Sequence, residues 1–378
     1  MAIAGGGTGG HTSAGLAVAH ALRCRSGPAA ELLWIGSRGG IEARVVPEAG
    51  IPYEPIATGK LRRSWSGRNV TDLLVHLPSG IVQARRRLRA FRPHVLFATG
   101  GFVSVPPALA AWSLRIPVVV HEQVAAPGLA NRLVGRIATR IALTFPQAGP
   151  AFPRGKTVVT GNPLRPELLG GPPREQALAL LRLDPGLPVV YVTGGAQGAH
   201  AINRAVGAIL HELLTTVQVI HQCGEQPTTG DRSWLEAQAR KLPEPLSARY
   251  RVTPYIGAGL REVYAAASLV VGRAGAGTVS ECCHLGLPGL FIPLPGASAD
   301  EQTANGRLLA EAGAALLLPE AELTPERLRD TILDLARRPM RLKQMGERAR
   351  GLALPDAADR IVALLFHVAH TDHEAGSP

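Results

Sequence analysis

Two segments of this 378-residue sequence begin in the same way, with a short apolar run that leads into a glycine cluster and then into a helical pattern. They are residues 2–11 and residues 189–198. A strand, a glycine turn and a helix in this order form the opening unit of a Rossmann-like fold. Because the unit occurs twice, the sequence predicts an α/β protein with two doubly wound, parallel-sheet domains.

Further apolar runs follow each opening and alternate with helical stretches, which is the rhythm of a parallel sheet. We place the domain boundary at the Gly161-Asn162-Pro163 turn, so that the domains cover residues 1–163 and 164–354. Residues 355–370 predict a terminal helix, which we assign to the first domain. We expect the domains to face each other across a cleft lined by the carboxyl ends of their strands. The predicted later strands are 32–36, 95–99, 116–121, 140–145 and 157–161, then 187–193, 217–222, 269–272, 289–293 and 314–318.

The net charge of +11 is unevenly distributed along the chain. Residues 1–163 hold 19 Lys and Arg against 6 Asp and Glu, whereas the remainder holds 21 against 23. The basic first domain therefore predicts an anionic partner, which can be a nucleic acid, a membrane surface or a substrate.

The segment from Val70 to Arg92 favours the membrane among these partners. It contains five leucine and isoleucine residues at mostly helical spacing and five arginines, a composition that suits an anionic bilayer surface. Pro78 is expected to interrupt or kink the segment. Phe91 is its only aromatic residue, which argues against nucleic acid; the alternative is an ordinary surface helix. The residues are Leu73, Leu74, Leu77, Ile81 and Leu88 with Arg85, Arg86, Arg87, Arg89 and Arg92.

Cysteine usage and hydropathy indicate a cytoplasmic location. The four cysteines, Cys24, Cys223, Cys282 and Cys283, have neither zinc-ligand nor disulfide spacing, and we predict no metal site. No apolar run approaches the roughly 20 residues that span a bilayer, and the sequence opens directly into its glycine turn. We therefore expect a protein that is neither exported nor transmembrane.

The first glycine cluster, Gly5 to His11, is the strongest candidate for chemistry. Glycines allow backbone N–H groups to approach a phosphate, and the following helix N-terminus favours negative charge. His11 is the only side chain there that exchanges a proton near neutral pH, so it predicts a general base acting on a hydroxyl. The alternatives are a tight turn without a ligand and a histidine that only caps the helix or binds a ligand.

Two more glycine loops follow predicted strands, at Gly100-Gly101-Phe102 and at Gly194 to Gly198. Neither contains the dinucleotide fingerprint with its downstream acidic residue, which argues against a dehydrogenase. The chain also lacks the Asp-x-Asp pair that commonly holds a metal-bound nucleotide sugar. We therefore expect backbone amides and helix N-termini to bind the diphosphate.

Two further segments offer polar groups to a sugar or a ribose. Glu281 lies at the end of a small-residue run, Ala274 to Glu281, and its carboxylate can accept hydrogen bonds from two ribose hydroxyls. Gln302 and Asn305 are three residues apart and share a helix face. The simpler explanations are interaction of Glu281 with the helix dipole and solvation of the two amides.

Seven motifs in order make the chain resemble the MurG family of glycosyltransferase family 28. The match runs from Gly5 to the P-D-A-A-D-R at Pro355 and so covers nearly the whole chain. The motifs are G-G-G-T-G-G-H at Gly5, G-G-F-V-S at Gly100, H-E-Q at His121, G-N-P at Gly161, G-G-A-Q-G-A at Gly194, G-T-V-S-E at Gly277 and D-E-Q-T-A-N at Asp300.

The resemblance implies a GT-B fold and an inverting N-acetylglucosaminyltransferase of peptidoglycan synthesis. It implies UDP-N-acetylglucosamine (UDP-GlcNAc) as donor and lipid I as acceptor, whose muramyl C4 hydroxyl is glycosylated to give lipid II. It further implies an acceptor- and membrane-binding first domain, a donor-binding second domain, no cofactor, and a peripheral place on the cytoplasmic membrane face. Other membrane-bound wall enzymes are implied as further partners.

The resemblance also assigns roles to residues. His11 would accept the proton, Glu281 would bind the ribose, and Gln302 with Asn305 would bind the hexose. The other implied substrate-binding residues are Thr8, Gly9, Gly10, Phe102, Gln123, Val124, Arg165, Ala196, Ile256, Ala276, Gly277, Thr278, Val279 and Ser280.

Three positions depart from the family's pattern. Val124 replaces the Asn that usually follows H-E-Q, Ala196 replaces a Ser of the second-domain loop, and Glu301 replaces a Gln or His. We expect the first two changes to weaken donor binding. Two rival functions stay open at this point: a UDP-GlcNAc 2-epimerase of the same fold, and a membrane scaffold that binds the nucleotide sugar without turnover. A glycolipid galactosyltransferase of the same fold matches the H-E-Q and D-E-Q-T-A-N segments less well.

Overall fold

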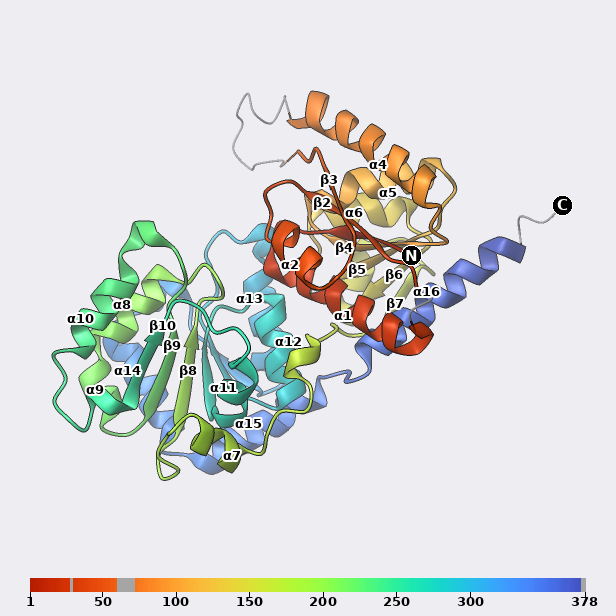
Figure 1. Cartoon of the computed structure of the whole chain (residues 1–378). Coiled ribbons are helices and arrows are strands. Elements are labelled where there is room, and N and C mark those ends of the chain that lie inside the picture. Colours follow the sequence, from red (N-terminus) through yellow and green to blue (C-terminus); the bar gives the residue numbers. More distant parts are fainter. Residues whose placement is uncertain (28–29, 60–71, 375–378) are drawn as a thin grey trace. The chain divides into compact units, whose positions relative to one another are not determined.

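A computed structural model describes residues 1–27, 30–59 and 72–374 of the chain (Figure 1). The chain divides into two compact units. The first consists of Met1–Pro166 with Leu354–Pro378, and the second of Glu167–Ala353.

The first unit is built on a sheet of seven parallel strands in the order β3-β2-β1-β4-β5-β6-β7. Chain order reverses beside β1, because β2 pairs with one edge of β1 and β4 with the other. The strands are β1 Ala2–Gly5, β2 Leu33–Ser37, β3 Tyr53–Ile56, β4 Leu96–Gly100, β5 Val118–Glu122, β6 Arg140–Leu143 and β7 Thr157–Val159.

Alternate residues of these strands pack into two separate hydrophobic cores, as the period of a strand requires. Ala2 and Ala4 belong to one core and Ile3 to the other. Helices α4, α5 and α6 cover the first face, and α1, α2 and α16 cover the second. The bounds are α1 Gly9–Ser26, α2 Glu42–Glu48, α4 Leu77–Phe91, α5 Val105–Ser113, α6 Leu129–Ile137 and α16 Ala357–Glu374, with short helices η2 Asp72–His76, η3 Phe102–Ser104, η4 Pro146–Ala151 and η5 Pro166–Leu168.

The second unit repeats this plan with six parallel strands in the order β10-β9-β8-β11-β12-β13. Chain order again reverses beside the first strand, because β8 lies between β9 and β11. The strands are β8 Val189–Thr193, β9 Gln218–Gln222, β10 Tyr250–Thr253, β11 Leu269–Gly272, β12 Gly289–Phe291 and β13 Ala315–Leu317. The helices are α7 Arg174–Leu180, α8 His200–Ala208, α9 Leu210–Leu214, α10 Asp231–Ala239, α11 Leu260–Ala266, α12 Ala276–Leu285, α13 Glu301–Glu311, α14 Pro325–Ala336 and α15 Pro339–Gly351. The short helices are η6 Pro227–Thr229, η7 Ser247–Arg249, η8 Ser298–Asp300 and η9 Glu320–Glu322.

The terminal helix α16 packs against α1 (Figure 1). Ile361, Leu365 and Val368 are buried in the same core as Val18, and Leu364 is partly buried there. The predicted apolar side of this helix is therefore the side that packs.

The structure corrects the interpretation of the segment from Val70 to Arg92. Val70 lies outside the described residues, and the segment is helical from Asp72 as the π-helix η2 followed by α4. Pro78 lies in the first turn of α4, where the hydrogen-bonding pattern changes from π to α. Leu88 is fully buried in the core, and among the side chains that the structure describes in this segment, the large apolar ones that are exposed are Leu74, Val75 and Val82.

Candidate active site

Three loops meet at the carboxyl ends of β1, β4 and β5 in the first unit. They contain Gly5 to Gly10, Gly100 to Phe102, and Gln123 with Val124. The loops after β1 and β4 flank the point where chain order reverses, which is where open α/β sheets bind their ligands. The corresponding loops of the second unit follow β8 and β11, and contain Gly194 to Gly198 and Arg273 to Gly277.

His11 is fixed by the carboxyl end of β4 and the glycine that follows it. Its Nδ1 lies 2.8 Å from the backbone oxygen of Thr99. Because a carbonyl oxygen can only accept, Nδ1 carries the proton and Nε2 carries the lone pair. A Cβ on Gly100 would lie 2.8 Å from Cε1 of the imidazole, and one on Gly101 would lie 3.3 Å from Cδ2. Glycine at both positions therefore lets the backbone pack against the ring.

Burial lowers the pKa of His11, and the hydrogen bond to Thr99 and the charge of Glu42 oppose the shift. A lowered pKa keeps the imidazole neutral near pH 7, so Nε2 is available to accept a proton. The geometry and the electrostatics of His11 therefore both suit a general base.

Glu42 is a site residue that the sequence analysis missed. The side chain is completely buried at the start of α2. Its Oε2 accepts from the backbone N–H of Gly7 at 3.0 Å, and its Oε1 accepts from the N–H and the hydroxyl of Ser37 at 3.2 and 2.5 Å. The carboxylate thus joins the loop after β1 to the carboxyl end of β2. In the sequence, the only local indication of this role was an acidic residue that closely follows the second strand and the glycines Gly39 and Gly40.

The remaining predicted residues of the first loop shape the start of α1. Thr8 is the N-cap, and its Oγ1 accepts from the N–H of His11 at 3.5 Å. Thr8 and Gly9 are exposed, and a Cβ on Gly9 would meet no atom within 4 Å. Open space over a helix N-terminus is suited to an anionic group. Gly10 lies against Gln123, whose Nε2 donates to the Gly10 oxygen at 3.3 Å.

Gln123 and Val124 follow β5 and are both buried. The N–H of Val124 donates to Oε1 of Glu122 at 3.1 Å, and Oε2 of Glu122 accepts from Nδ2 of Asn131 at 3.0 Å. The Asn131 amide also donates to the oxygen of His121 at 3.2 Å. Asn131, which the sequence analysis also missed, therefore ties α6 to the loop that contacts Gly10. Phe102 is partly buried and packs against the adjoining core.

Arg165 lies in the first unit, six residues after β7, and is half-buried. The other residues that were predicted to hold the nucleotide sugar lie in the second unit.

In the second unit, Ala196 and Ile256 are held in loops beside β8 and β9. Ala196 is exposed, and its backbone oxygen accepts from Glu225 at 3.1 Å. The N–H of Ile256 donates to Oε1 of Gln222 at 3.0 Å. The side chain of Ala196 is therefore accessible to a ligand.

The small-residue run becomes the first turns of α12. Ala276, Gly277 and Thr278 are half-buried at the N-terminus, where Gly275 caps the helix without a side-chain hydrogen bond. Val279, Ser280 and Glu281 are buried. Oε2 of Glu281 accepts from the hydroxyl of Tyr264 at 2.6 Å. Because Glu281 follows the first turn, the alternative of a first-turn acid that stabilises the helix dipole does not apply.

Gln302 and Asn305 both lie on α13 but differ in their surroundings. Gln302 is half-buried, and its Oε1 accepts from the N–H of Leu294 at 2.9 Å. Asn305 is fully buried, and its Nδ2 donates to the oxygen of Ala274 at 3.2 Å. The structure thus gives Asn305 a part in positioning the loop before α12.

Both halves of the chain match domain models of one glycosyltransferase family. Residues 1–143 match the glycosyltransferase family 28 N-terminal domain, and residues 189–361 match the glycosyltransferase family 28 C-terminal domain. The crystal structure of MurG from Acinetobacter baumannii superposes with a TM-score of 0.73 at 29% identity, over 97% of this chain and 98% of that one. The fold and the family models therefore define a family 28 glycosyltransferase with the GT-B architecture.

The particular family follows from full-length relatives. Proteins from Syntrophotalea carbinolica and Lactiplantibacillus plantarum are 38% and 36% identical over 377 and 366 residues. The alignments cover 98% and 97% of this chain, and 99% and 98% of the relatives. Both are named UDP-N-acetylglucosamine--N-acetylmuramyl-(pentapeptide) pyrophosphoryl-undecaprenol N-acetylglucosamine transferase. The chain belongs to this family, the MurG family.

The chain also resembles a UDP-GlcNAc 2-epimerase, but only in its fold. A UDP-GlcNAc 2-epimerase from Neisseria meningitidis superposes with a TM-score of 0.66, over 97% of this chain and 98% of that one, but is only 14% identical.

Proposed function

We propose that the chain transfers N-acetylglucosamine from UDP-GlcNAc to the C4 hydroxyl of the muramyl sugar of lipid I, giving lipid II with inversion at the anomeric carbon. The observation that carries the proposal is His11, whose Nδ1 is held by Thr99 so that Nε2 remains a base. Membership of the MurG family supplies the donor and the acceptor.

In the proposed reaction, Nε2 of His11 takes the proton from the C4 hydroxyl as its oxygen attacks the anomeric carbon. The new C–O bond forms while the bond from that carbon to the UDP oxygen breaks, and UDP leaves with the electron pair. Orientation of the two substrates contributes most of the acceleration, and a general base adds about 10² to 10⁴-fold.

The leaving diphosphate needs positive partners, and backbone amides can supply them. Gly195 in the loop after β8, and Gly275 and Gly277 at the N-terminus of α12, border open space, and a helix N-terminus beside open space suits a diphosphate. We assign the ribose to Glu281 and the hexose to Gln302, with Asn305 supporting the loop before α12. We also propose that Arg165 neutralises part of the negative charge on the diphosphate of the leaving UDP. Among residues 1–27, 30–59 and 72–374, no cluster of three His, Cys, Asp or Glu side chains is placed to hold a metal ion.

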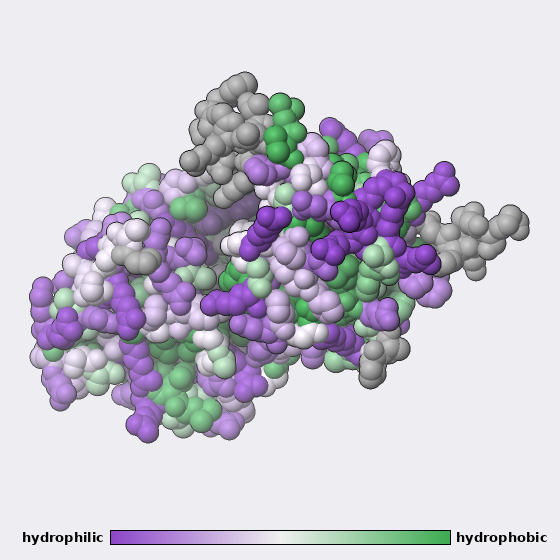
Figure 2. All heavy atoms as spheres, turned by 45° about the horizontal axis from the view of Figure 1, so that its top comes forward, coloured by the Kyte–Doolittle hydropathy of each residue, from purple (hydrophilic) through white to green (hydrophobic). Residues whose placement is uncertain are grey.

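We further propose that the protein works at the cytoplasmic face of the membrane as a peripheral protein. No helix in the described part of the chain is long and apolar enough to cross a bilayer. Leu74 and Val75 are exposed in η2, and Val82, Arg86 and Arg89 are exposed along α4. Figure 2 shows hydrophobic side chains near the start of α4 and mostly hydrophilic ones along its remainder. Apolar side chains beside arginines can bind an anionic bilayer.

Association with other membrane-bound wall enzymes stays a prediction. It is supported by the family resemblance alone.

A transfer assay tests this function. The protein is incubated with labelled UDP-GlcNAc and a short-chain lipid I analogue without added metal, beside a control without acceptor. Label in the disaccharide lipid, with an intact donor in the control, supports the proposal. Epimer formation in the control would favour the 2-epimerase, and UDP-GlcNAc binding without any product would favour the scaffold.

A further inference from the structure

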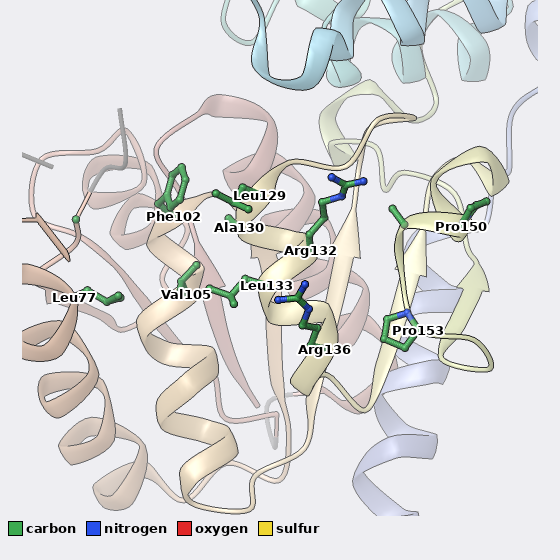
Figure 3. Close-up of a pocket in the computed structure, with 12 residues that line it drawn as sticks. Leu77, Phe102, Val105, Leu129, Ala130, Arg132, Leu133, Arg136, Pro150 and Pro153 are labelled. Atoms are coloured by element: carbon green, nitrogen blue, oxygen red, sulfur yellow. The ribbon is translucent and has the colours of Figure 1, made fainter. Parts of the chain in front are cut away.

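A pocket of about 720 Å³ lies beside α6 in the first unit, with Phe102 next to Leu129 at one end (Figure 3). It belongs to the unit that the family resemblance already assigns to the acceptor and the membrane. A buried contact of the second unit, between Tyr264 and Glu281, has no such assignment and concerns the donor instead.

Tyr264 is a buried residue of α11 whose side chain is held at two points. Its hydroxyl donates to Oε2 of Glu281 at 2.6 Å. Its ring packs edge-on against that of Tyr191, with the ring centroids 5.3 Å apart. Burial, and then the charge of Glu281, raise the pKa of Tyr264 well above its ordinary value, so the hydroxyl keeps its proton. Tyr264 is therefore a fixed hydrogen-bond donor to the carboxylate.

Glu281 lies at the border between the interior of the second unit and open space. It follows Gly277 by four residues on α12, and a helical side chain covers the turn that precedes it. The side chain of Glu281 therefore lies over the first turn of α12, on the face of Gly277. A Cβ on Gly275 or Gly277 would meet no atom within 4 Å. Since we place the diphosphate in this open space, the ribose joined to it comes to lie near Glu281.

The contact with Tyr264 determines how the carboxylate of Glu281 is presented. An ionised carboxylate accepts about four hydrogen bonds, so the bond from Tyr264 is compatible with further bonds from ribose hydroxyls. A glutamate side chain rotates about several bonds, and a partner that fixes it before the donor arrives reduces the entropy lost on binding. The bond from Tyr264 is thus suited to hold Glu281 ready for the ribose.

We propose that Tyr264 is a positioning residue that holds the carboxylate of Glu281 toward the ribose of the donor, and so makes the protein selective for ribonucleotide sugars over deoxyribonucleotide sugars. Tyr264 acts through Glu281 and does not touch the donor. This assignment rests on the proposed function, which gives the ribose to Glu281. A bond that only stabilises the second unit is the competing explanation, and the experiment separates the two.

The experiment measures KM and kcat at saturating acceptor for three donors, which are UDP-GlcNAc and its analogues without the ribose 2′ or 3′ hydroxyl. A hydrogen bond to a charged group corresponds to about 10- to 100-fold in affinity, so the parent protein should show a KM higher by that factor for at least one analogue. Tyr264→Phe should raise KM for UDP-GlcNAc about tenfold and change it little for that analogue, so that the discrimination largely disappears. The kcat for UDP-GlcNAc should stay unchanged, because a ribose contact is equal in the ground state and the transition state.

Tyr250→Phe is the matched control for a loss of stability. It also removes a hydroxyl that is hydrogen-bonded in the interior of the second unit, at 2.9 Å from Nδ1 of His221. Tyr250 packs in the core on one face of the sheet, whereas Tyr191 of β8 points to the other face, where Tyr264 contacts it. Tyr250→Phe should therefore lower the midpoint of thermal unfolding without changing the discrimination between donors.

A double variant tests whether Tyr264 acts through Glu281. In a Glu281→Ala background, Tyr264→Phe should cause no further rise in the donor KM, because the two side chains act as a pair. A further rise would overturn the proposal, since Tyr264 would then affect the donor by another route.

Folding of Tyr264→Phe is expected because phenylalanine fills the same space and keeps the ring contact with Tyr191. Circular dichroism and thermal unfolding check it. A second measurement keeps the hydroxyl and incorporates fluorotyrosine in place of Tyr264. Its fluorine resonance should shift more on saturation with UDP than with 2′,3′-dideoxy-UDP, and equal shifts would contradict the proposal.

The remaining outcomes separate this proposal from the proposed function. Undiminished discrimination in Tyr264→Phe would leave its bond to Glu281 with a structural role only. Transfer by the parent protein with equal KM values for all three donors would place the ribose away from Glu281 and overturn the proposal, although the transfer activity would stand. If the parent protein transferred from no donor, the proposed function itself would fail.

Discussion

The Nδ1 atom of His11 lies 2.8 Å from the backbone oxygen of Thr99, the residue before the glycines that contact its ring. The bond fixes the tautomer, so one nitrogen is permanently a donor and the other remains free to act as a base. The carboxyl end of a different strand, β4, thus determines which ring nitrogen of His11 carries the proton.

The pH dependence of kcat should report this base. Burial lowers the pKa of His11, so the group stays neutral, and active, to a lower pH than an ordinary histidine. We expect kcat to fall only as pH drops below the ordinary value of about 6.5. A profile of kcat against pH at saturating substrate concentrations measures this decrease, which is the acid limb of the profile. A decrease of kcat that begins above about pH 6.5 would contradict a histidine whose pKa is lowered by burial.

Glu42→Gln should shift the acid limb of the kcat profile to lower pH. The charge of Glu42 raises the pKa of His11, so its removal should lower the pKa further and shift the acid limb to lower pH. The substitution also places an amide NH₂ among the donors of Gly7 and Ser37, at a cost of about 1–3 kcal/mol of stability. Glu48→Gln, on the exposed side of the same helix, is the control. A loss of stability without a shifted limb would leave Glu42 with a structural role only.

The parts of the fold that the sequence predicted are those with a local signal. Central parallel strands are buried on both faces and read as continuous apolar runs, as in Val118-Val119-Val120. The strands β3 and β10 were missed, because each is a short edge strand that contains charged residues, Glu54 and Arg251. The π-helix before Pro78 has no periodicity of its own and was also missed.

The same distinction applies to the site. His11 and its glycines lie within one motif and could be recognised from it. The partners of Glu42, by contrast, lie 5 and 35 residues away along the chain, and the partner of Asn305 lies 31 residues away. Such pairings depend on the tertiary fold, so residue type and spacing could not reveal that Asn305 is buried against the loop before α12.

Asn305→Ala should therefore act mainly through stability and donor binding. It removes a fully buried amide that donates to Ala274, and a lost buried hydrogen bond costs about 1–3 kcal/mol. We expect a lower midpoint of thermal unfolding and a higher KM for UDP-GlcNAc. Gln302→Ala, at a half-buried position, should change the midpoint less. The reverse order of the two midpoints would contradict this account of Asn305.

Ala196→Ser should strengthen donor binding. Ala196 is exposed in the loop after β8, and a hydroxyl there could donate to a phosphate. A hydrogen bond to a charged group is worth about 1.5–3 kcal/mol, so we expect KM for UDP-GlcNAc to fall about tenfold or more. The KM for the acceptor serves as the internal control. An unchanged donor KM would place the diphosphate elsewhere.

Stability should decrease in mild acid because of His221. Its ring is fully buried between Tyr250 and Asn203, and burial lowers its pKa to about 3. The unfolded chain, with a histidine pKa of about 6.5, binds the proton more readily, so stability falls as pH drops from about 6.5 toward 3. The full effect is on the order of 5 kcal/mol. His221→Gln should flatten the slope of unfolding midpoint against pH in this window, and an unchanged slope would assign the effect to other groups.

The most direct test of the central claim compares single-turnover transfer to lipid I by the parent protein, by His11→Ala and by His20→Ala. His20 is exposed on the same helix and lies away from the glycine loop, so it controls for loss of a histidine. The account predicts a loss of about 10² to 10⁴-fold for His11→Ala and none for His20→Ala, with unchanged folding. Transfer by His11→Ala at the rate of the parent protein would contradict the assignment of His11 as the base.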